Sequence, residues 1–173
     1  AALFLTERLP SALCERLLSL HADQEQALRF LLLVIALHDL GKATPAFQKK
    51  AEWAEKALSA RGLPFFGTPK EHHSDTGMFF LAPTLRELGV ERRPASVFAR
   101  CVTAHHGEFP PNRRRLPLEE QGYGEGWNHA RRGVVDALAS LFAPRELEGL
   151  RSPSRGDVMV LSGLASVADW VGS

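Results

Sequence analysis

Histidine and aspartate side chains recur near predicted helix ends in this chain, where they could share a metal ion. Imidazole and carboxylate groups suit first-row divalent metals such as manganese, iron, cobalt, nickel and zinc, whereas magnesium is less suited to so many imidazoles. A bound metal lowers the pKa of a water ligand and provides hydroxide near neutral pH. The pattern therefore predicts a hydrolytic centre with one or two divalent ions. Its candidate ligands are His38, Asp39, His73, His105, His106 and Asp169.

The His38–Asp39 pair directly follows 30–37, the longest apolar stretch of the chain. An imidazole and a carboxylate beside a buried apolar helix cost free energy unless they are paired or bind a metal. Taken alone, the pair fits a capped helix end better than a catalytic centre, and Lys42 fits a solvated lysine. The neighbours favour catalysis, because Gly41 permits a sharp turn and Lys42 places a cation where it would meet a phosphate charge.

Two pairs of adjacent histidines also lie at predicted helix ends. Neighbouring side chains point about a third of a turn apart on a helix. His105 and His106 can therefore bind one metal only where the backbone bends, and the glycine that follows supplies this bend. A pair of surface histidines is the alternative. In the other pair His73 is expected to face inward and His72 outward, since Gly77 shares the face of His73 and would let another helix approach.

The last candidate ligand, Asp169, lies in an apolar helix rich in small residues. A carboxylate there needs a partner, which would be a metal, an arginine or a helix N-terminus. Asp136 and Asp157 have polar surroundings and are expected to be exposed.

Helical periodicity dominates the elements that must position these residues. An all-α, compact single domain is expected, with a minor hairpin in the loop 107–126 as the one exception. Asp23 and Thr44 are predicted N-caps, and Pro83 is expected to kink or end its helix. The predicted helices are 1–8, 11–21, 24–40, 44–59, 72–88, 94–106, 127–142, 144–150 and 155–172.

The composition is that of an ordinary globular domain. The 173 residues are 45% apolar and carry a net charge of +1, so binding to nucleic acid would have to be local. Cys14 and Cys101 lack metal-binding spacing and are expected to be buried free thiols in a reducing cytoplasm. The apolar stretch 30–37 is too short to cross a bilayer, so no membrane partner is expected.

The sequence from His38 to Gln48, His-Asp-Leu-Gly-Lys-Ala-Thr-Pro-Ala-Phe-Gln, resembles the HD motif of the nuclease domain in the CRISPR type I interference helicase–nuclease. This family belongs to the HD superfamily of metal-dependent phosphohydrolases. His73 with Gly77 resembles the family's next metal-binding helix, and His105-His106-Gly107 resembles its double-histidine motif. The segment 168–173, Ala-Asp-Trp-Val-Gly-Ser, resembles the end of its HD domain.

The resemblance implies a division of the ligands between one metal and, if two ions bind, a second. His38, Asp39 and Asp169 would hold the first, and the second would be held by His73, His105 and His106 and bridged through Asp39. Lys42 would be catalytic with Asp39, because it would stabilise charge on the phosphorane or position the water. The family also uses a histidine on its first helix, which is expected to precede Ala1. His21 is too close to His38 for that role and is expected to be a surface residue.

The family's activity is divalent-metal-dependent cleavage of single-stranded DNA in antiviral defence. The resemblance implies manganese, nickel, cobalt, iron or magnesium as the cofactor, and a cytoplasmic location. It also implies a helicase in cis or in trans, which receives its target from a guide-RNA surveillance complex. The domain is expected to span 1–173, with a helicase region after it in the full-length protein.

The loop 107–126 carries basic and aromatic residues that suit single-strand binding, namely the arginines 113–115 with Tyr123 and, just after the loop, Trp127. A solvated charge run is an equal alternative for the arginines. Two rival functions remain open for the whole chain. One is an HD phosphohydrolase that acts on nucleotides or cyclic dinucleotides, which the 42–48 extension disfavours. The other is a metal-free helical interaction module.

Overall fold

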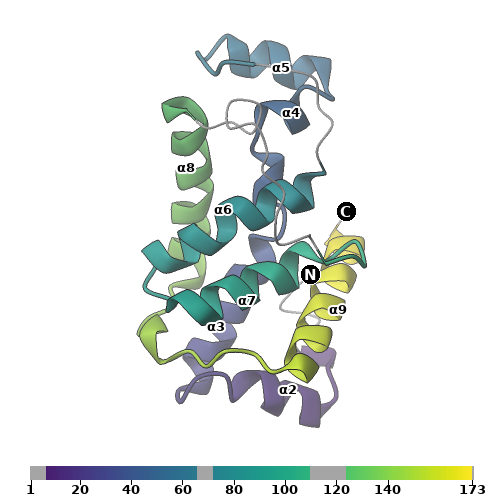
Figure 1. The fold of residues 1–173 in the computed structure, drawn as a ribbon, viewed down its shortest axis with the longest axis vertical. Coiled ribbons are helices and arrows are strands. Elements are labelled where there is room, and N and C mark those ends of the chain that lie inside the picture. Colours follow the sequence, from purple (N-terminus) through teal and green to yellow (C-terminus); the bar gives the residue numbers. More distant parts are fainter. Residues whose placement is uncertain (1–6, 66–71, 110–123, 173) are drawn as a thin grey trace.

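The computed structural model describes residues 7–65, 72–109 and 124–172, and these residues form helices without a β-strand, which confirms the all-α fold (Figure 1). The α-helices are α2 (Ser11–Leu18), α3 (Gln24–Ala36), α4 (Pro45–Gln48), α5 (Glu52–Ser59), α6 (His73–Glu87), α7 (Arg92–Thr103), α8 (Glu125–Phe142) and α9 (Arg155–Gly172). Two 3₁₀ helices join them, η1 (Leu40–Lys42) and η2 (Leu147–Gly149). Within the described residues, no helix is long and apolar enough to cross a membrane.

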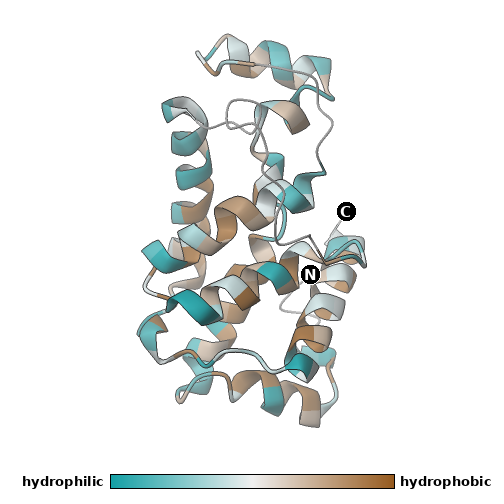
Figure 2. Ribbon diagram, in the orientation of Figure 1, coloured by the Kyte–Doolittle hydropathy of each residue, from teal (hydrophilic) through white to brown (hydrophobic). Residues whose placement is uncertain are grey.

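The core is built around α3, whose residues from Phe30 to Ile35 are all buried. This helix contacts α2, α7 and α8, while α7 packs against α6 on one side and α9 on the other. Phe30 and Phe98 meet edge to face in the middle, with ring centres 4.8 Å apart. Figure 2 shows hydrophobic residues where α6 and α7 cross the molecule. The apolar periodicity of the sequence is therefore used for helix-on-helix packing.

Both predicted N-caps are confirmed. Asp23 accepts hydrogen bonds from the backbone N–H groups of Glu25 and Gln26 at the start of α3. Thr44 accepts one from the N–H of Phe47 at the start of α4. Each side chain satisfies N–H groups that a helix start leaves without an internal partner.

Several predicted helix ends are wrong by a few residues or more. α3 ends at Ala36 and α7 at Thr103, so the histidines that follow them lie in turns. The predicted helix 44–59 is two helices, and only the 3₁₀ turn Leu147–Gly149 forms within 144–150. α6 continues through Pro83 to Glu87 because its packing on α7 and η1 outweighs the lost hydrogen bond. Most of 1–8 and of the proposed hairpin lies outside the described residues.

Two polar residues predicted to be at the surface are buried. His21 is 6% exposed, with Nδ1 accepting from the N–H of Asp23 and Nε2 lying 3.0 Å from the carbonyl of Glu146. Asp157 is 7% exposed and accepts hydrogen bonds from Arg16 and from the N–H of Ser154. Both predictions were wrong because one partner of each residue, Glu146 for His21 and Arg16 for Asp157, lies far away in sequence and is brought close only by the fold.

Candidate metal centre

The predicted ligands come from four separate segments that the helix packing brings together. His38 and Asp39 lie in the turn between α3 and η1, and His73 is the first residue of α6. The other histidines, 105 and 106, lie in the turn after α7, and Asp169 lies in the last turns of α9. Gly107, with φ of +88°, provides the predicted bend after the double histidine.

Close packing of η1 on α6 brings the first two segments together. A Cβ atom on Gly41 would lie 1.9 Å from the carbonyl oxygen of His73 and 2.6 Å from the backbone nitrogen of Gly77. Gly41 is therefore required for close approach. Gly41 also lies within the 3₁₀ turn η1, but its φ is not among the positive ones, so the close packing and not the backbone conformation calls for glycine here. A Cβ on Gly77 would lie 3.3 Å from Thr103 Cγ2 and 3.5 Å from the nitrogen of Gly41, so the tighter of these two contacts is with α7.

Hydrogen bonds to backbone carbonyls fix two of the imidazole rings. His38 Nδ1 lies 2.7 Å from the carbonyl oxygen of Ile35, and His105 Nδ1 lies 2.9 Å from that of Val102. A carbonyl oxygen can only accept, so Nδ1 of each ring carries the hydrogen. The Nε2 atom of each neutral ring then presents a lone pair toward the centre, which is the arrangement of metal-binding histidines.

The Nε2 atoms and carboxylate oxygens converge at distances suited to a shared ion. His73 Nε2 lies 3.0 Å from His106 Nε2 and 3.3 Å from His105 Nε2. His38 Nε2 lies 3.2 Å from Asp39 Oδ2 and 3.3 Å from Asp169 Oδ1. Two ligands at right angles around an ion, each at about 2.1 Å, would be about 3.0 Å apart. The spacing therefore fits ligands of one or more divalent metals.

Asp39 shows why the cluster fits a cation. Its Oδ1 atom is buried and accepts no hydrogen bond from the described residues. The nearest groups are Nε2 of His73 at 3.3 Å and Nε2 of His105 at 3.7 Å. Since a buried polar atom normally has a partner, a carboxylate oxygen this close to two imidazole nitrogens, one of them the unprotonated Nε2 of His105, fits a cation bound among them.

The potential metal ligands do not divide into two separate sets, because the groups that they form share residues. Three overlapping groups have their potential ligand atoms within 4.8 Å of one another. One group joins His105 to His38 and Asp39, and another joins it to His106 and Asp169. The described side chains therefore form one continuous cluster. The groups are His38–Asp39–His105, His105–His106–Asp169 and His72–His73–His106.

His72 is a further member of this cluster that was not predicted from the sequence. The side chain is exposed, as predicted, but its ring centre lies 4.7 Å from that of His73 and 4.9 Å from that of His106. The sequence does contain a pattern that could have predicted this position, because His72-His73 is an adjacent pair of histidines like His105-His106.

Comparison with known proteins agrees with this geometry. The family model for the HD domain of Cas3 matches residues 1–173. This chain belongs to the Cas3 HD domain family. It is 34% identical to the CRISPR-associated endonuclease/helicase Cas3 of Thermus thermophilus, over 87% of this chain and 17% of that protein. The chain thus spans less than a fifth of that relative's length.

Solved structures that share the fold of this Cas3 HD domain include the following two. A crystal structure of a CRISPR-associated protein is 33% identical, with a TM-score of 0.89, over 99% of this chain and 20% of that one. A crystal structure of the Thermus thermophilus Cas3 HD domain in the presence of Ni²⁺ is 28% identical, with a TM-score of 0.57. That match covers 86% of this chain and 55% of the other.

The electrostatics of the Cas3 HD centre keep Asp39 ionised and His105 neutral. Burial alone would raise the pKa of Asp39, but His38, His73 and Lys42 outweigh it and hold this pKa far below its usual range. Burial lowers the pKa of His105 to about 4. For His38 burial opposes protonation, but the neighbouring carboxylates and the Ile35 carbonyl raise its pKa. An anionic carboxylate and a neutral imidazole are the forms that bind metals.

Lys42 lies beside Asp39, as the sequence predicts. Its ammonium is 2.5 Å from Asp39 Oδ2 and 5.7 Å from the ring centre of Phe47. Phe47 in turn meets the ring of His73 edge to face at 5.3 Å. The lysine side chain is 37% exposed, so its charge is within reach of a phosphate entering from solvent.

The aromatic prediction for the loop after the double histidine is wrong for Trp127. This side chain is 3% exposed and donates from Nε1 to the carbonyl of Pro64 at 2.7 Å, so it is not free to stack on a base. The arginines 113–115 and Tyr123 lie outside the described residues.

Proposed function

We propose that this Cas3 HD domain is a divalent-metal-dependent nuclease that cleaves single-stranded DNA. The observation that carries the proposal is the convergence of imidazole Nε2 atoms on the partly buried Asp39 carboxylate, whose Oδ1 atom is buried. The name of the Thermus thermophilus relative, an endonuclease/helicase, and the Ni²⁺ used with a related HD domain support it.

The ligand assignment extends the geometry of the cluster. His38, Asp39 and Asp169 would hold one metal, and His73, His105 and His106 would hold a second together with Asp39 where two ions bind. The metal is manganese, nickel, cobalt, iron or magnesium. When bound, it lowers the pKa of a water ligand so that hydroxide forms near neutral pH.

This chain's residues then position the phosphodiester and carry its charge. Asp39, held ionised by its neighbours, orients the attacking water oxygen toward phosphorus. The new P–O bond forms as the bond to one ester oxygen breaks, and that oxygen leaves as a hydroxyl with a proton from solvent, which replaces the proton that the attacking water gave up. Lys42 stabilises the negative charge on the phosphorane from its place beside Asp39.

The test separates metal binding from catalysis with two variants. Asp39→Ala should reduce manganese-, nickel- or cobalt-dependent cleavage of circular single-stranded DNA by at least about a hundredfold, because it removes a central ligand. Lys42→Ala should lower kcat by about a hundredfold while Mn²⁺ affinity, measured by calorimetry, stays unchanged or rises. Asp136→Ala, at an exposed position on α8, is the matched control and should behave as wild type. Undiminished cleavage by Asp39→Ala would refute the assignment.

The nucleotide phosphohydrolase rival is separated by substrate. The proposed domain should cleave long or circular single-stranded DNA and leave deoxynucleoside triphosphates and cyclic dinucleotides intact. Rapid hydrolysis of the small substrates alone would favour the rival. A thermal midpoint that no divalent ion shifts would favour the metal-free interaction module.

We also propose that the domain works in the cytoplasm with a helicase in cis or in trans. This helicase would receive its target DNA from a guide-RNA surveillance complex. Support comes from the endonuclease/helicase name of a relative several times longer than this chain. In this proposal residues 1–173 are the single HD nuclease domain, which works together with the helicase.

A further inference from the structure

A buried arginine on α8 reaches the turn that carries Asp39 and Lys42. Arg131 is 5% exposed and donates from Nη1 to the carbonyl oxygen of Ala43 at 2.9 Å. Ala43 caps η1 at its C-terminal end and links it to α4. The arginine therefore connects a distant helix to the backbone directly after the proposed catalytic lysine.

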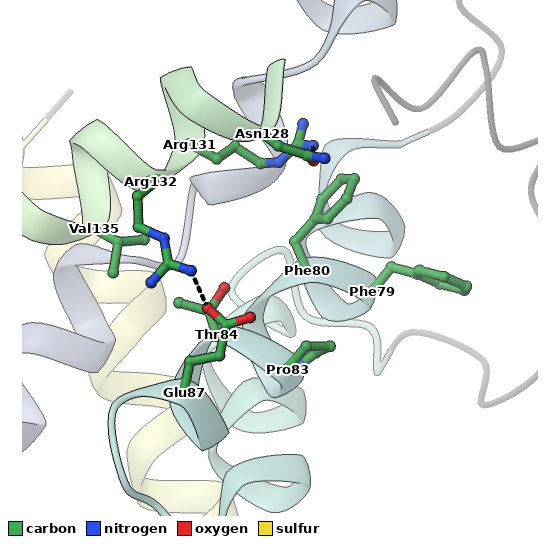
Figure 3. A pocket seen from close by; sticks show the side chains of 9 residues that line it. All are labelled: Phe79, Phe80, Pro83, Thr84, Glu87, Asn128, Arg131, Arg132 and Val135. Atoms are coloured by element: carbon green, nitrogen blue, oxygen red, sulfur yellow. Dashed lines mark hydrogen bonds and ion pairs between the residues drawn. The ribbon is translucent and has the colours of Figure 1, made fainter. Parts of the chain in front are cut away.

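Two further contacts hold the guanidinium of Arg131 in place (Figure 3). Its central carbon lies 3.7 Å from the ring centre of Phe80, and Nη2 donates to Asn128 Oδ1 at 2.5 Å. Phe80 belongs to α6, the helix that begins at His73. One side chain thus joins α8, α6 and the junction between η1 and α4.

The hydrogen bonds along this turn show what the arginine adds. Three successive carbonyls, those of residues 41–43, each accept a side-chain hydrogen bond. The first comes from Thr44 Oγ1 at 3.0 Å and the second from Gln48 Nε2 at 2.9 Å, both from the next few residues of the chain. The third comes from Arg131, which is 88 positions away. Arg131 therefore fixes the turn relative to the rest of the fold, whereas the other two fix its internal shape.

We propose that Arg131 is a positioning residue for the metal centre. It sets where η1 sits against α6, and with it the placement of Asp39 and Lys42 against the histidines. This role rests on the proposed nuclease function. An arginine suits it because a planar guanidinium stacks on a ring with its face while its edges donate in two directions, which a lysine ammonium cannot do.

The neighbouring arginine offers a matched control. Arg132 belongs to the same helix but pairs with Glu87 at 2.6 Å, and both side chains are 53% exposed. Figure 3 shows this pair in the pocket between α6 and α8, which Arg132 enters from the α8 side. A change at Arg132 removes a positive charge from α8 without touching the carbonyl of Ala43.

The experiment compares Arg131→Lys, Arg131→Gln and Arg132→Gln in the same chain. Mn²⁺ affinity is measured by calorimetry, and kcat and KM on single-stranded DNA by steady-state kinetics. Both Arg131 variants should bind Mn²⁺ about tenfold more weakly, as expected for a residue that supports ligands. They should also lower kcat with little change in KM. Arg132→Gln should stay within about twofold of wild type in every quantity, as expected for an exposed ion pair.

A milder variant covers the case in which the Arg131 variants do not fold. Asn128 is exposed, so Asn128→Ala should fold and release one contact of the guanidinium. It should weaken Mn²⁺ binding and lower kcat in the same direction, by a smaller factor.

The results also separate this inference from the proposed function. If the Arg131 variants bind Mn²⁺ and turn over like wild type, the positioning role is overturned and the proposed function is not, even if their thermal midpoint falls. Where the Arg131 variants do not fold, the same result for Asn128→Ala overturns the role. Full activity of Arg131→Lys would overturn the claim that a planar guanidinium, which donates in two directions, is needed. A wild-type chain that binds no Mn²⁺ would contradict both proposals.

Discussion

The two nitrogen atoms of His38, and likewise of His105, have different tasks. Nδ1 is committed to a backbone carbonyl in both rings, which leaves Nε2 for the centre. The carbonyls belong to residues three positions earlier, at the ends of α3 and α7. A helix end thus supplies the acceptor that sets the tautomer of the histidine following it.

At the residue scale, the structure makes a pH-dependent prediction for Asp157. Burial alone would raise its pKa, but hydrogen bonds from Ser154 and Arg16 outweigh burial and lower the pKa below its usual value. Ionised Asp157 therefore contributes its full stabilisation of the fold above the pKa that it has in the unfolded chain. This contribution is lost as pH falls through the lower pKa that it has in the folded protein. Asp157→Asn should cost about 1–2 kcal/mol at pH 7, a range reduced because Arg16 is half exposed.

Urea unfolding of both proteins between pH 7 and pH 3 measures this effect. The difference between wild type and Asp157→Asn should be constant near neutrality and shrink below about pH 4. Asp136→Asn, at an exposed position on α8, is the control and should unfold like wild type at pH 7. A difference that grows toward acid pH would contradict the assignment.

The sequence predicts single residues well where local context decides. The glycine at 77, on the same face as His73, predicts that His73 faces inward and His72 outward, and His73 is indeed buried while His72 is exposed. His21 and Asp157 failed because their burial depends on Glu146 and Arg16, which periodicity cannot place. Arg131 gave no signal at all, since a lone arginine in an amphipathic helix looks like a surface residue.

At the scale of elements, the close contact between η1 and α6 is the most exacting feature. Helices that approach this closely need a residue without a side chain, and Gly41 meets backbone atoms that cannot rotate away. The sequence shows a glycine after the His-Asp pair, but local context explained it by a turn. The reason could not be read from the chain, because the atoms that forbid a Cβ belong to His73 and Gly77.

Gly41→Ala should therefore separate η1 from α6. A clash with fixed backbone is expected to cost about 1–3 kcal/mol or more, and Mn²⁺ affinity should fall because Asp39 moves away from His73. Thermal unfolding and calorimetry measure the two effects.

Gly133→Ala is the matched control within α8. A Cβ there meets nothing within 4 Å, and alanine favours a helix over glycine, so this variant should be more stable by about 0.5–1 kcal/mol. A Gly41→Ala protein with wild-type stability and metal affinity would show that the contact is not required.

Over the whole molecule, the all-α fold follows from apolar periodicity, and most helices were predicted with their correct cores. The ends were less accurate, because α3 and α7 stop where packing, and not propensity, turns the chain. The convergence of segments 38–39, 73, 105–106 and 169 could not be predicted from spacing alone. It depends on α6 packing against α7 and η1, and on α7 packing against α9.

The most direct test of a metal centre in this domain is anomalous X-ray scattering from crystals soaked with Mn²⁺. We expect a peak about 2.1 Å from Nε2 atoms of His73, His105 or His106, or of His38. An Asp39 oxygen should lie at a similar distance, and Asp39→Ala crystals should lose the peak. Wild-type crystals that show no anomalous peak within the cluster, at Mn²⁺ concentrations that support cleavage, would contradict the proposed metal centre.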